Sequence, residues 1–266
     1  MVLKLLYCGD VVGRAGRDIV LKEIPKLREE LALDFVVVSS DNAAGGFGVT
    51  PFECGDFFKA GVDVLTGGDH VWDQREIVSH IGHEHRLLRP LNFPKRTPGD
   101  GMGVYETKKG KKIAVIHLLG QVFHKEHLDC PFAAAESALA GLTLKGNVDA
   151  ILVDMHAEAT SEKNAMGHFL DGKVSAVTGS HTHVPTHDAR IFDGGTGYIT
   201  DAGMCGDYNS VIGFRKDEPI QQFLTKMRKQ KLEPAKNEAT LCGIVFEIND
   251  KGLTESLTII RRGKVL

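Results

Sequence analysis

The stretch Val174-Ser175-Ala176-Val177-Thr178-Gly179-Ser180-His181-Thr182-His183 places two histidines directly after a run of small and β-branched residues. Residues 174–178 are typical of a strand that is buried on both faces, as strands of a parallel sheet are. In an extended segment His181 and His183 would project to the same face, so both could reach a metal site. A His-x-His pair also occurs on surface strands and in protein cores, so the prediction needs support from other segments.

Four other predicted strands end in the same way, in side chains that bind metals. They run into Gly9-Asp10, Ser40-Asp41-Asn42, Gly67-Gly68-Asp69-His70 and Asp154-Met155-His156. Each segment is weak by itself, because aspartate and asparagine after a strand often only form a turn. Together they are informative, since loops at the carboxyl ends of strands build the active site of an α/β sheet. Carboxylate, amide and imidazole groups suit Fe, Mn or Zn better than Mg or Ca, so the pattern predicts a metal-dependent hydrolase.

Predicted strands alternate with predicted helices along the whole chain. Apolar runs and alternation place strands at residues 3–7, 35–38, 62–65, 104–107, 113–118, 150–153, 174–178, 197–200, 242–248 and 257–261. Helical spacing places helices at 17–31, 52–60, 75–81, 131–139 and around 219–229. A long connection over 86–103 is rich in proline and glycine. We therefore expect an α/β fold with two sheets face to face and helices outside, a four-layer α-β-β-α sandwich, in a single domain over 1–266.

Composition excludes several other classes of protein. The chain has 266 residues, 42% hydrophobic and 25% charged, which is ordinary for a globular enzyme. A net charge of −3 argues against stable nucleic-acid binding, which needs excess lysine and arginine. No apolar run approaches the roughly 20 residues of a membrane span, so no membrane partner is predicted. The five cysteines include no C-x-x-C pair, which indicates free thiols and a cytoplasmic location.

Longer motifs surround the metal-binding segments. They are Gly9-Asp10-Val11-Val12-Gly13 with Gly16-Arg17, Asp41-Asn42-Ala43-Ala44-Gly45-Gly46, Asp69-His70-Val71-Trp72-Asp73, Arg89-Pro90-Leu91-Asn92-Phe93, His156-Ala157-Glu158-Ala159-Thr160-Ser161-Glu162-Lys163, His181-Thr182-His183-Val184-Pro185-Thr186 and Tyr198-Ile199-Thr200-Asp201-Ala202-Gly203-Met204. In these motifs, which span nearly the whole chain, the sequence resembles the bacterial calcineurin-like metallophosphoesterases of the 2′,3′-cyclic-nucleotide 2′-phosphodiesterase type, the YmdB-like family.

The resemblance implies a complete dinuclear centre. The first metal would be held by Asp10, Asp41, Asn42 and His183, and the second by Asp41, Asp69, His156 and His181, with Asp41 bridging. It further implies that a metal-bridged hydroxide attacks the phosphorus of a small cyclic nucleotide, with 2′,3′-cyclic mononucleotides the first candidates. His70 would be the general acid that protonates the leaving oxygen, a role typically worth about 10²–10⁴-fold in rate. Iron or manganese is expected by resemblance and ligand type, with zinc or magnesium as second choices.

Two positions depart from the family pattern. Where relatives carry Glu-Asn this chain has Asp41-Asn42, and where they carry Asn-His it has Asp69-His70. The extra carboxylate at Asp69 is expected to weaken attraction of an anionic substrate and to raise the pKa of the bridging water, or to favour a mixed-valent Fe(III) centre. Two alternatives to the phosphodiesterase stay open, namely a metallophosphatase for phosphomonoesters and a regulatory protein with a weakened metal site. A homo-oligomer, dimer or tetramer, is a further expectation.

Other conspicuous residues receive less specific interpretations. The glycine-rich run 43–48 lacks the spacing of a nucleotide phosphate loop, so no cofactor-binding loop is predicted. Phe47 is expected to pack in the core or loop, with base stacking as the alternative, and His168 is as compatible with a substrate pocket as with the surface. Glu158, Thr160 and Ser161 are candidates for orienting the ligating imidazoles. The remaining histidines are assigned to a solvated surface, except His117, which is expected in the core; the surface set is His80, His83, His85, His124, His127 and His187.

Overall fold

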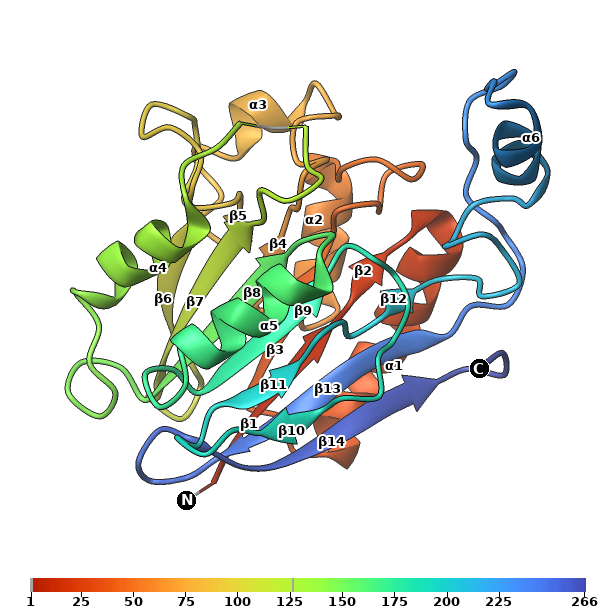
Figure 1. Ribbon diagram of the computed structural model, residues 1–266. Helices are drawn as coiled ribbons and strands as arrows, with labels where there is room; N and C mark the ends of the chain where they lie inside the picture. The colour runs from red at the N-terminus through yellow and green to blue at the C-terminus, as the bar shows by residue number, and fades with distance from the viewer. Residues whose placement is uncertain (1, 126) are drawn as a thin grey trace.

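In the computed structural model, which describes residues 2–125 and 127–266, the amino- and carboxyl-terminal strands belong to one six-stranded sheet (Figure 1). Its order is β14 (Thr254–Arg262), β13 (Leu241–Ile248), β1 (Leu3–Cys8), β3 (Phe35–Ser39), β4 (Val64–Thr66) and β5 (Leu87–Leu88). The strands β1, β3, β4 and β5 are parallel, and β13 joins β1 in antiparallel register. The carboxyl-terminal hairpin therefore completes the sheet that the first strand begins.

The middle of the chain forms a second six-stranded sheet. Its order is β10 (Arg190–Ile191), β11 (Gly197–Ile199), β9 (Ala176–Ser180), β8 (Ala150–His156), β7 (Lys112–Leu119) and β6 (Met102–Glu106). The four central strands are parallel, while β6 and β10 are antiparallel edges. A short parallel pair, β2 (Asp10–Val11) with β12 (Met204–Cys205), continues from the end of β1.

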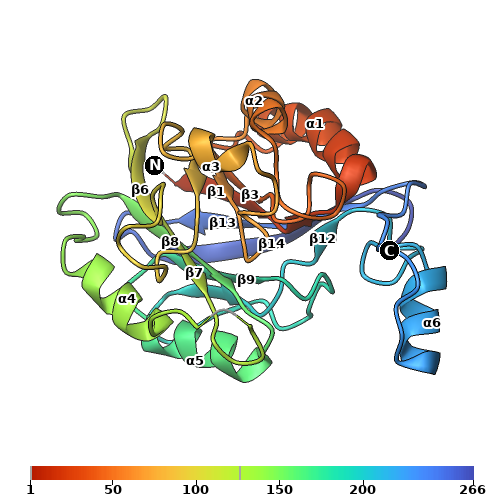
Figure 2. The ribbon, with the colours of Figure 1, turned by 90° about the horizontal axis from the view of Figure 1, so that it is seen from above.

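The two sheets face each other and carry helices on their outer faces (Figure 2). Between the sheets, Tyr7, Phe35 and Phe246 of the first pack in one cluster with Val115 and Leu152 of the second. The helices α1 (Gly13–Glu30), α2 (Pro51–Lys59) and α3 (Ile77–His80) cover the first sheet, and α4 (Pro131–Leu139) and α5 (Thr160–Phe169) cover the second. The last helix, α6 (Asp217–Thr225), projects from the body of the protein. Among residues 2–125 and 127–266, none of the helices combines the length and apolar content that a membrane crossing requires.

Local sequence explains where the helices over the first sheet begin. Thr50 caps α2: its hydroxyl accepts the backbone N–H of Glu53, and the Glu53 carboxylate accepts the backbone N–H of Thr50. Pro51 occupies the first helical position, where its missing N–H costs nothing. The predicted helix 17–31 starts four residues earlier, at Gly13, and continues through Pro25.

The predicted elements agree with the structure apart from their ends and five omissions. The helix at 131–139 matches α4, but the helix predicted over 75–81 is reduced to four residues and the one at 219–229 ends at Thr225. The strand predicted over 150–153 runs on to His156. The omitted elements are β2, β5, β10, β12 and α5. Helix α5 lacks an apolar stripe because Glu162 and Lys163 lie on its buried face.

Candidate metal centre

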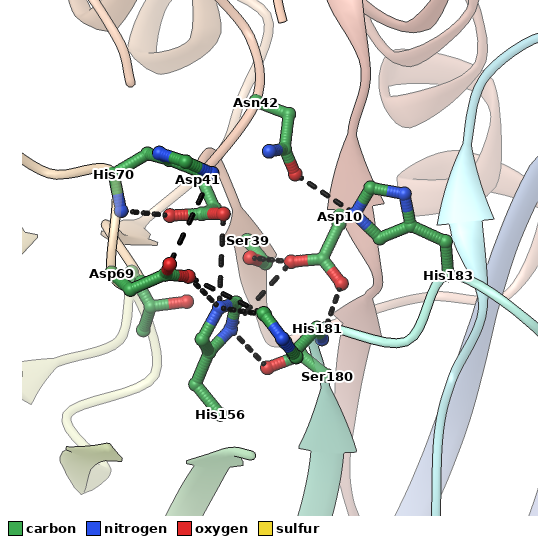
Figure 3. A network of polar contacts seen from close by, with 12 residues as sticks. Asp10, Ser39, Asp41, Asn42, Asp69, His70, His156, Ser180, His181 and His183 are labelled. Carbon is green, nitrogen blue, oxygen red and sulfur yellow. Dashed lines mark hydrogen bonds and ion pairs between the residues drawn. The ribbon is translucent and has the colours of Figure 1, made fainter. Parts of the chain in front are cut away.

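All seven predicted ligands gather where the parallel strands of both sheets end (Figure 3). Asp10 begins the short strand β2 just after β1, and the loops after β3 and β4 supply Asp41 and Asp69. Strand β8 ends in His156, and the loop after β9 supplies His181 and His183. Ligand atoms lie within 4.8 Å of one another in three sets: Asp69 with His156 and His181, Asp10 with Asp41 and His156, and Asp41 with Asp69 and His70.

The orientation of His156 is fixed by hydrogen bonds behind it. Its Nδ1 lies 2.9 Å from the Ser180 hydroxyl, which donates to Oδ1 of Asp154 at 2.8 Å. Since that hydroxyl proton is engaged, Ser180 accepts from His156, and Nδ1 carries the imidazole hydrogen. The lone pair of Nε2 then faces Oδ1 of Asp69 at 3.0 Å and Nδ1 of His181 at 3.1 Å. Atoms that accept hydrogen bonds converge there, as they do around a bound cation.

The same logic applies to His183 and Asn42. The Nδ1–H of His183 donates to the carbonyl of Ile212 at 2.7 Å, which leaves Nε2 as the acceptor. The amide nitrogen of Asn42 donates to the carbonyl of Gly46 at 3.2 Å, so its oxygen points the other way. That oxygen lies 2.9 Å from Nε2 of His183. Two lone-pair atoms at this separation fit joint ligation of a cation.

Three carboxylates are brought together with little exposure to solvent. Burial raises the pKa of Asp41 well above its usual value, and the charges of Asp69 and Asp10 raise it further. Burial also opposes ionisation of Asp10, but the imidazoles of His156 and His183 outweigh it and lower its pKa. Asp69 behaves similarly, since burial opposes its ionisation but the neighbouring imidazoles of His156 and His181 outweigh burial and lower its pKa. Within the described ranges, the ion-pair partners of these three carboxylates are all histidines. The donor set and its negative charge therefore fit bound metal cations.

His70 stands at the rim of this cluster. Its backbone N–H donates to Oδ1 of Asp41 at 2.8 Å, and its ring Nδ1 lies 2.8 Å from Oδ2 of Asp73. The other ring nitrogen, Nε2, is 3.9 Å from Oδ2 of Asp69. Phe47 packs edge-on against the ring at 5.1 Å and also contacts Phe214. The imidazole is thus fixed at one nitrogen and directs the other to the site.

The backbone that carries Asp69 passes unusually close to Asp41. Gly68 has φ +58°, and a Cβ there would lie 2.1 Å from Oδ1 of Asp41, so the close approach requires glycine. Its N–H donates to Nε2 of His117 at 3.0 Å, while Nδ1 of His117 lies 3.0 Å from Asp154. The prediction of a hydrogen-bonded core histidine at His117 is therefore confirmed.

Two predictions about histidines were wrong. The segment containing His181 and His183 is a turn rather than an extended strand, because β9 ends at Ser180 and both histidines have positive φ, 92° and 64°. Their side chains consequently reach different parts of the cluster. His124 was assigned to the surface, but its ring centre lies 4.7 Å from that of His181, so it lies beside the candidate ligands. His127 and His187 are exposed as expected.

Other expectations gave mixed outcomes. Glu158 does contact a predicted ligand, with its Oε2 at 3.2 Å from Nε2 of His181, whereas Thr160 and Ser161 begin α5 as exposed residues. His168 is exposed, as the surface interpretation expected, and it stacks on Phe192 with the ring centres 4.3 Å apart.

Sequence reasoning missed three residues that orient the cluster, namely Ser39, Asp73 and Ser180. Ser39 donates to Oδ1 of Asp10 at 2.6 Å. A usable signal existed for the two serines, because each ends a strand just before a predicted ligand segment.

Comparisons with known proteins identify relatives of this chain. The family described as "YmdB-like protein" matches residues 6–260. The chain is 41% identical to the 2′,3′-cyclic-nucleotide 2′-phosphodiesterase of Bacillus subtilis over 94% of this chain and 92% of that protein. It is 36% identical to a putative phosphatase/phosphodiesterase of Mycoplasma pneumoniae over 97% of this chain and 93% of the relative.

Two solved structures are similar to this one over nearly the whole chain. A hypothetical protein from Thermus thermophilus has a TM-score of 0.91 at 35% identity, covering 99% of this chain and 100% of the other. A novel phosphatase from Mycoplasma pneumoniae has a TM-score of 0.91 at 34% identity, covering 99% and 94%.

Proposed function

Because this chain belongs to the YmdB-like family, we propose that it hydrolyses cyclic nucleotides at a dinuclear metal centre, with 2′,3′-cyclic mononucleotides as substrates. The chain is a phosphoesterase by its relationship to the curated enzymes, so the proposal concerns its substrate and its mechanism. The observation that carries the proposal is the convergence of lone-pair atoms from His156, His183 and Asn42 with three carboxylates.

We assign the predicted ligands to two ions. Asp10, Asp41, Asn42 and His183 would hold the first, and Asp41, Asp69, His156 and His181 the second. The pairing of His183 with Asn42, and of His156 with Asp69 and His181, supports this division. The mixture of oxygen and nitrogen donors favours iron or manganese, with zinc or magnesium as second choices.

In this proposal the chain's own residues hold the two ions and move one proton. Two cations bound here would lower the pKa of a water molecule and neutralise charge on the phosphoryl oxygens. His70, with Nδ1–H held by Asp73, would give the proton on Nε2 to the departing ribose 2′ oxygen. The backbone N–H of His70 meanwhile holds Asp41 in place.

Turnover of 2′,3′-cyclic AMP tests the proposal directly. Protein reconstituted with Mn²⁺ or Fe²⁺ is expected to release the 3′-monophosphate, and a chelator is expected to abolish the reaction. Identifying the product isomer distinguishes cleavage of the 2′ bond from cleavage of the 3′ bond. Absence of turnover by protein that holds two metal ions would contradict the cyclic-diester assignment.

A phosphomonoesterase is the second candidate, favoured by the description of the Mycoplasma relative as a putative phosphatase/phosphodiesterase. The same metal centre would hydrolyse phosphomonoesters, and only the fit between the protein and the leaving group of the substrate would differ. Comparing bis-p-nitrophenyl phosphate with p-nitrophenyl phosphate separates the two, because a monoesterase would turn over the second faster.

The wider organisation is also a proposal. We assign residues 1–266 to one domain with the four-layer α-β-β-α arrangement of metallophosphoesterases, which the helices outside both sheets and the pairing of β13 with β1 support. The five free cysteines support a cytoplasmic location. The exposed apolar side chains Phe223, Leu224 and Met227 near α6 are a candidate contact between copies in a homo-oligomer, which sedimentation would detect.

A further inference from the structure

The turn that carries His181 and His183 is strained. Both residues adopt positive φ, 92° and 64°, although neither is glycine. Such backbone persists only where surrounding contacts hold it, because side chains other than glycine disfavour this region. Thr182 lies between the two histidines, so whatever holds Thr182 also sets the direction of both imidazoles.

Asp201 makes that contact from a neighbouring loop. Its Oδ2 accepts the backbone N–H of Thr182 at 3.1 Å and the Thr182 hydroxyl at 2.6 Å. Its Oδ1 accepts the N–H of Gly203 at 2.8 Å, and the side chain of Asp201 is fully buried. The carboxylate therefore fastens the middle of the histidine turn to the segment that follows β11.

Lys163 of α5 supplies the matching charge. Its Nζ lies 2.8 Å from Oδ2 of Asp201, and its side chain is 1% exposed. Its stem packs against Gly179, where a Cβ would come within 2.9 Å of the Lys163 Cδ. A buried ammonium or carboxylate alone is costly, so the two residues depend on each other.

We propose that Lys163, Asp201 and Thr182 form a positioning network that aims His181 and His183 at the two metal sites. This inference rests on the proposed function, since it assumes that both histidines bind metal. In this proposal none of the three residues is itself a metal ligand. They act through the turn, and loss of the network is expected to weaken both sites together, because the two histidines serve different ions.

The Thr182→Val variant tests the network with minimal disturbance, because Thr182 is only partly buried and valine keeps its shape. Titration of the metal-free protein with Mn²⁺, followed by electron paramagnetic resonance, measures the affinity of both sites without any substrate. Outer partners of ligating histidines typically affect metal affinity about 10–100-fold, and we expect a loss in this range at both sites. Thr182→Ser retains the hydroxyl and is expected to bind Mn²⁺ like the unmodified protein.

A matched control separates positioning from general stability. Thr254 also donates its hydroxyl in a hydrogen bond, to the carbonyl of Ser175 at 2.7 Å, but at the buried start of β14 rather than near the cluster. Thr254→Val is expected to lower the melting temperature without changing the Mn²⁺ affinity. If Thr182→Val and Thr254→Val have the same Mn²⁺ affinity, the network has only a structural role and the inference is overturned.

The ion pair itself is tested by a neutral replacement. Either single change would strand a buried charge and could prevent folding, so the double variant Lys163→Met with Asp201→Asn is used. If it folds, reduced Mn²⁺ affinity at both sites is expected, and unchanged affinity would overturn the role of the pair. Failure of the double variant to fold would leave Thr182→Val to decide. Failure of the proposed function would be seen in the unmodified protein rather than in the variants. That protein would then bind no Mn²⁺, or it would bind two ions and hydrolyse no cyclic nucleotide.

Discussion

The Nδ1 atom of His70 lies 2.8 Å from Oδ2 of Asp73, three residues later in the same loop. This contact holds the imidazole by one nitrogen and leaves Nε2 for proton transfer. We expect His70→Asn to lower kcat for 2′,3′-cyclic AMP by about 10²–10⁴-fold, the usual contribution of a general acid. Metal content should stay the same, because the contact between this loop and Asp41 uses the backbone N–H of His70.

Leaving-group dependence provides the control for His70. A p-nitrophenolate leaving group needs little protonation, so bis-p-nitrophenyl phosphate should lose far less activity in the His70→Asn variant. Asp73→Asn should give a smaller loss than His70→Asn for the cyclic nucleotide, since it only loosens the ring. Equal losses for both substrates would assign His70 to binding rather than to acid catalysis.

The carboxylate of Asp69 lies 3.0 Å from Nε2 of His156 and 3.3 Å from Nδ1 of His181. The substitution Asp69→Asn introduces the amide expected here from the resemblance to the family and removes one negative charge from the centre. A neighbouring charge commonly shifts a pKa by about 1–3 units. We expect the variant to move the acidic limb of the kcat/KM profile to lower pH and to lower KM for anionic diesters.

The affinity of the Asp69→Asn variant for Mn²⁺ should fall, because an amide oxygen is a weaker ligand than a carboxylate. If both the acidic limb and the metal affinity are unchanged, the charge argument is wrong.

Asp41 is expected to destabilise the protein when metal is absent. Its pKa is raised by burial and by the charges of Asp69 and Asp10. Below about pH 4, the usual aspartate pKa, the folded and unfolded states both hold the proton and Asp41 costs nothing. Between the two pKa values, the folded protein retains a proton on Asp41 that the unfolded chain has lost. Above the raised folded-state pKa, Asp41 is ionised in both states, but its charge is unfavourable in the buried site of the folded protein. Stability is therefore lost over this range.

The Asp41→Asn variant should reverse this loss. In chelator-treated protein at neutral pH we expect its melting temperature to rise by a few degrees, since about 1 kcal/mol corresponds to about 2–4 °C in a chain of this size. The difference should shrink towards pH 4. With saturating Mn²⁺ the order should invert, because the variant has lost a shared ligand. The check is thermal unfolding at neutral pH and at pH 4, each with chelator and with saturating Mn²⁺. If the Asp41→Asn variant is less stable than the unmodified protein under all four conditions, the argument is wrong.

Much of the fold and site was accessible from the sequence, because buried parallel strands appear as short apolar runs and their ligands follow directly. This is why Asp10, Asp41 and His156 could be selected before their geometry was known. Helix α5 was missed because its buried face carries the charged residue Lys163, whose partner Asp201 lies 38 residues away. No local pattern reveals such a pair.

The conformation of the histidine turn was equally inaccessible. Alternation predicted that His181 and His183 share a face, but contacts from Asp201 and Asp10 hold the segment in a left-handed conformation. His124 was misplaced for a related reason, since only the path of the chain brings it beside His181. Long-range contacts thus determine where the polar loop residues point.

Gly68 offers the most direct test that Asp41 serves both metal sites. Alanine at this position would put its Cβ 2.1 Å from Oδ1 and 2.4 Å from Cγ of Asp41, so the carboxylate must move. The positive φ adds a backbone cost of about 1–2 kcal/mol. Gly45 is the matched control, with φ +60° and nothing within 4 Å of an added Cβ. Gly45→Ala should therefore show a similar backbone penalty in thermal unfolding and normal Mn²⁺ binding. Gly68→Ala should lose Mn²⁺ affinity at both sites together. Loss at one site alone would mean that Asp41 does not bridge, and normal binding at both would mean that Asp41 is not a ligand.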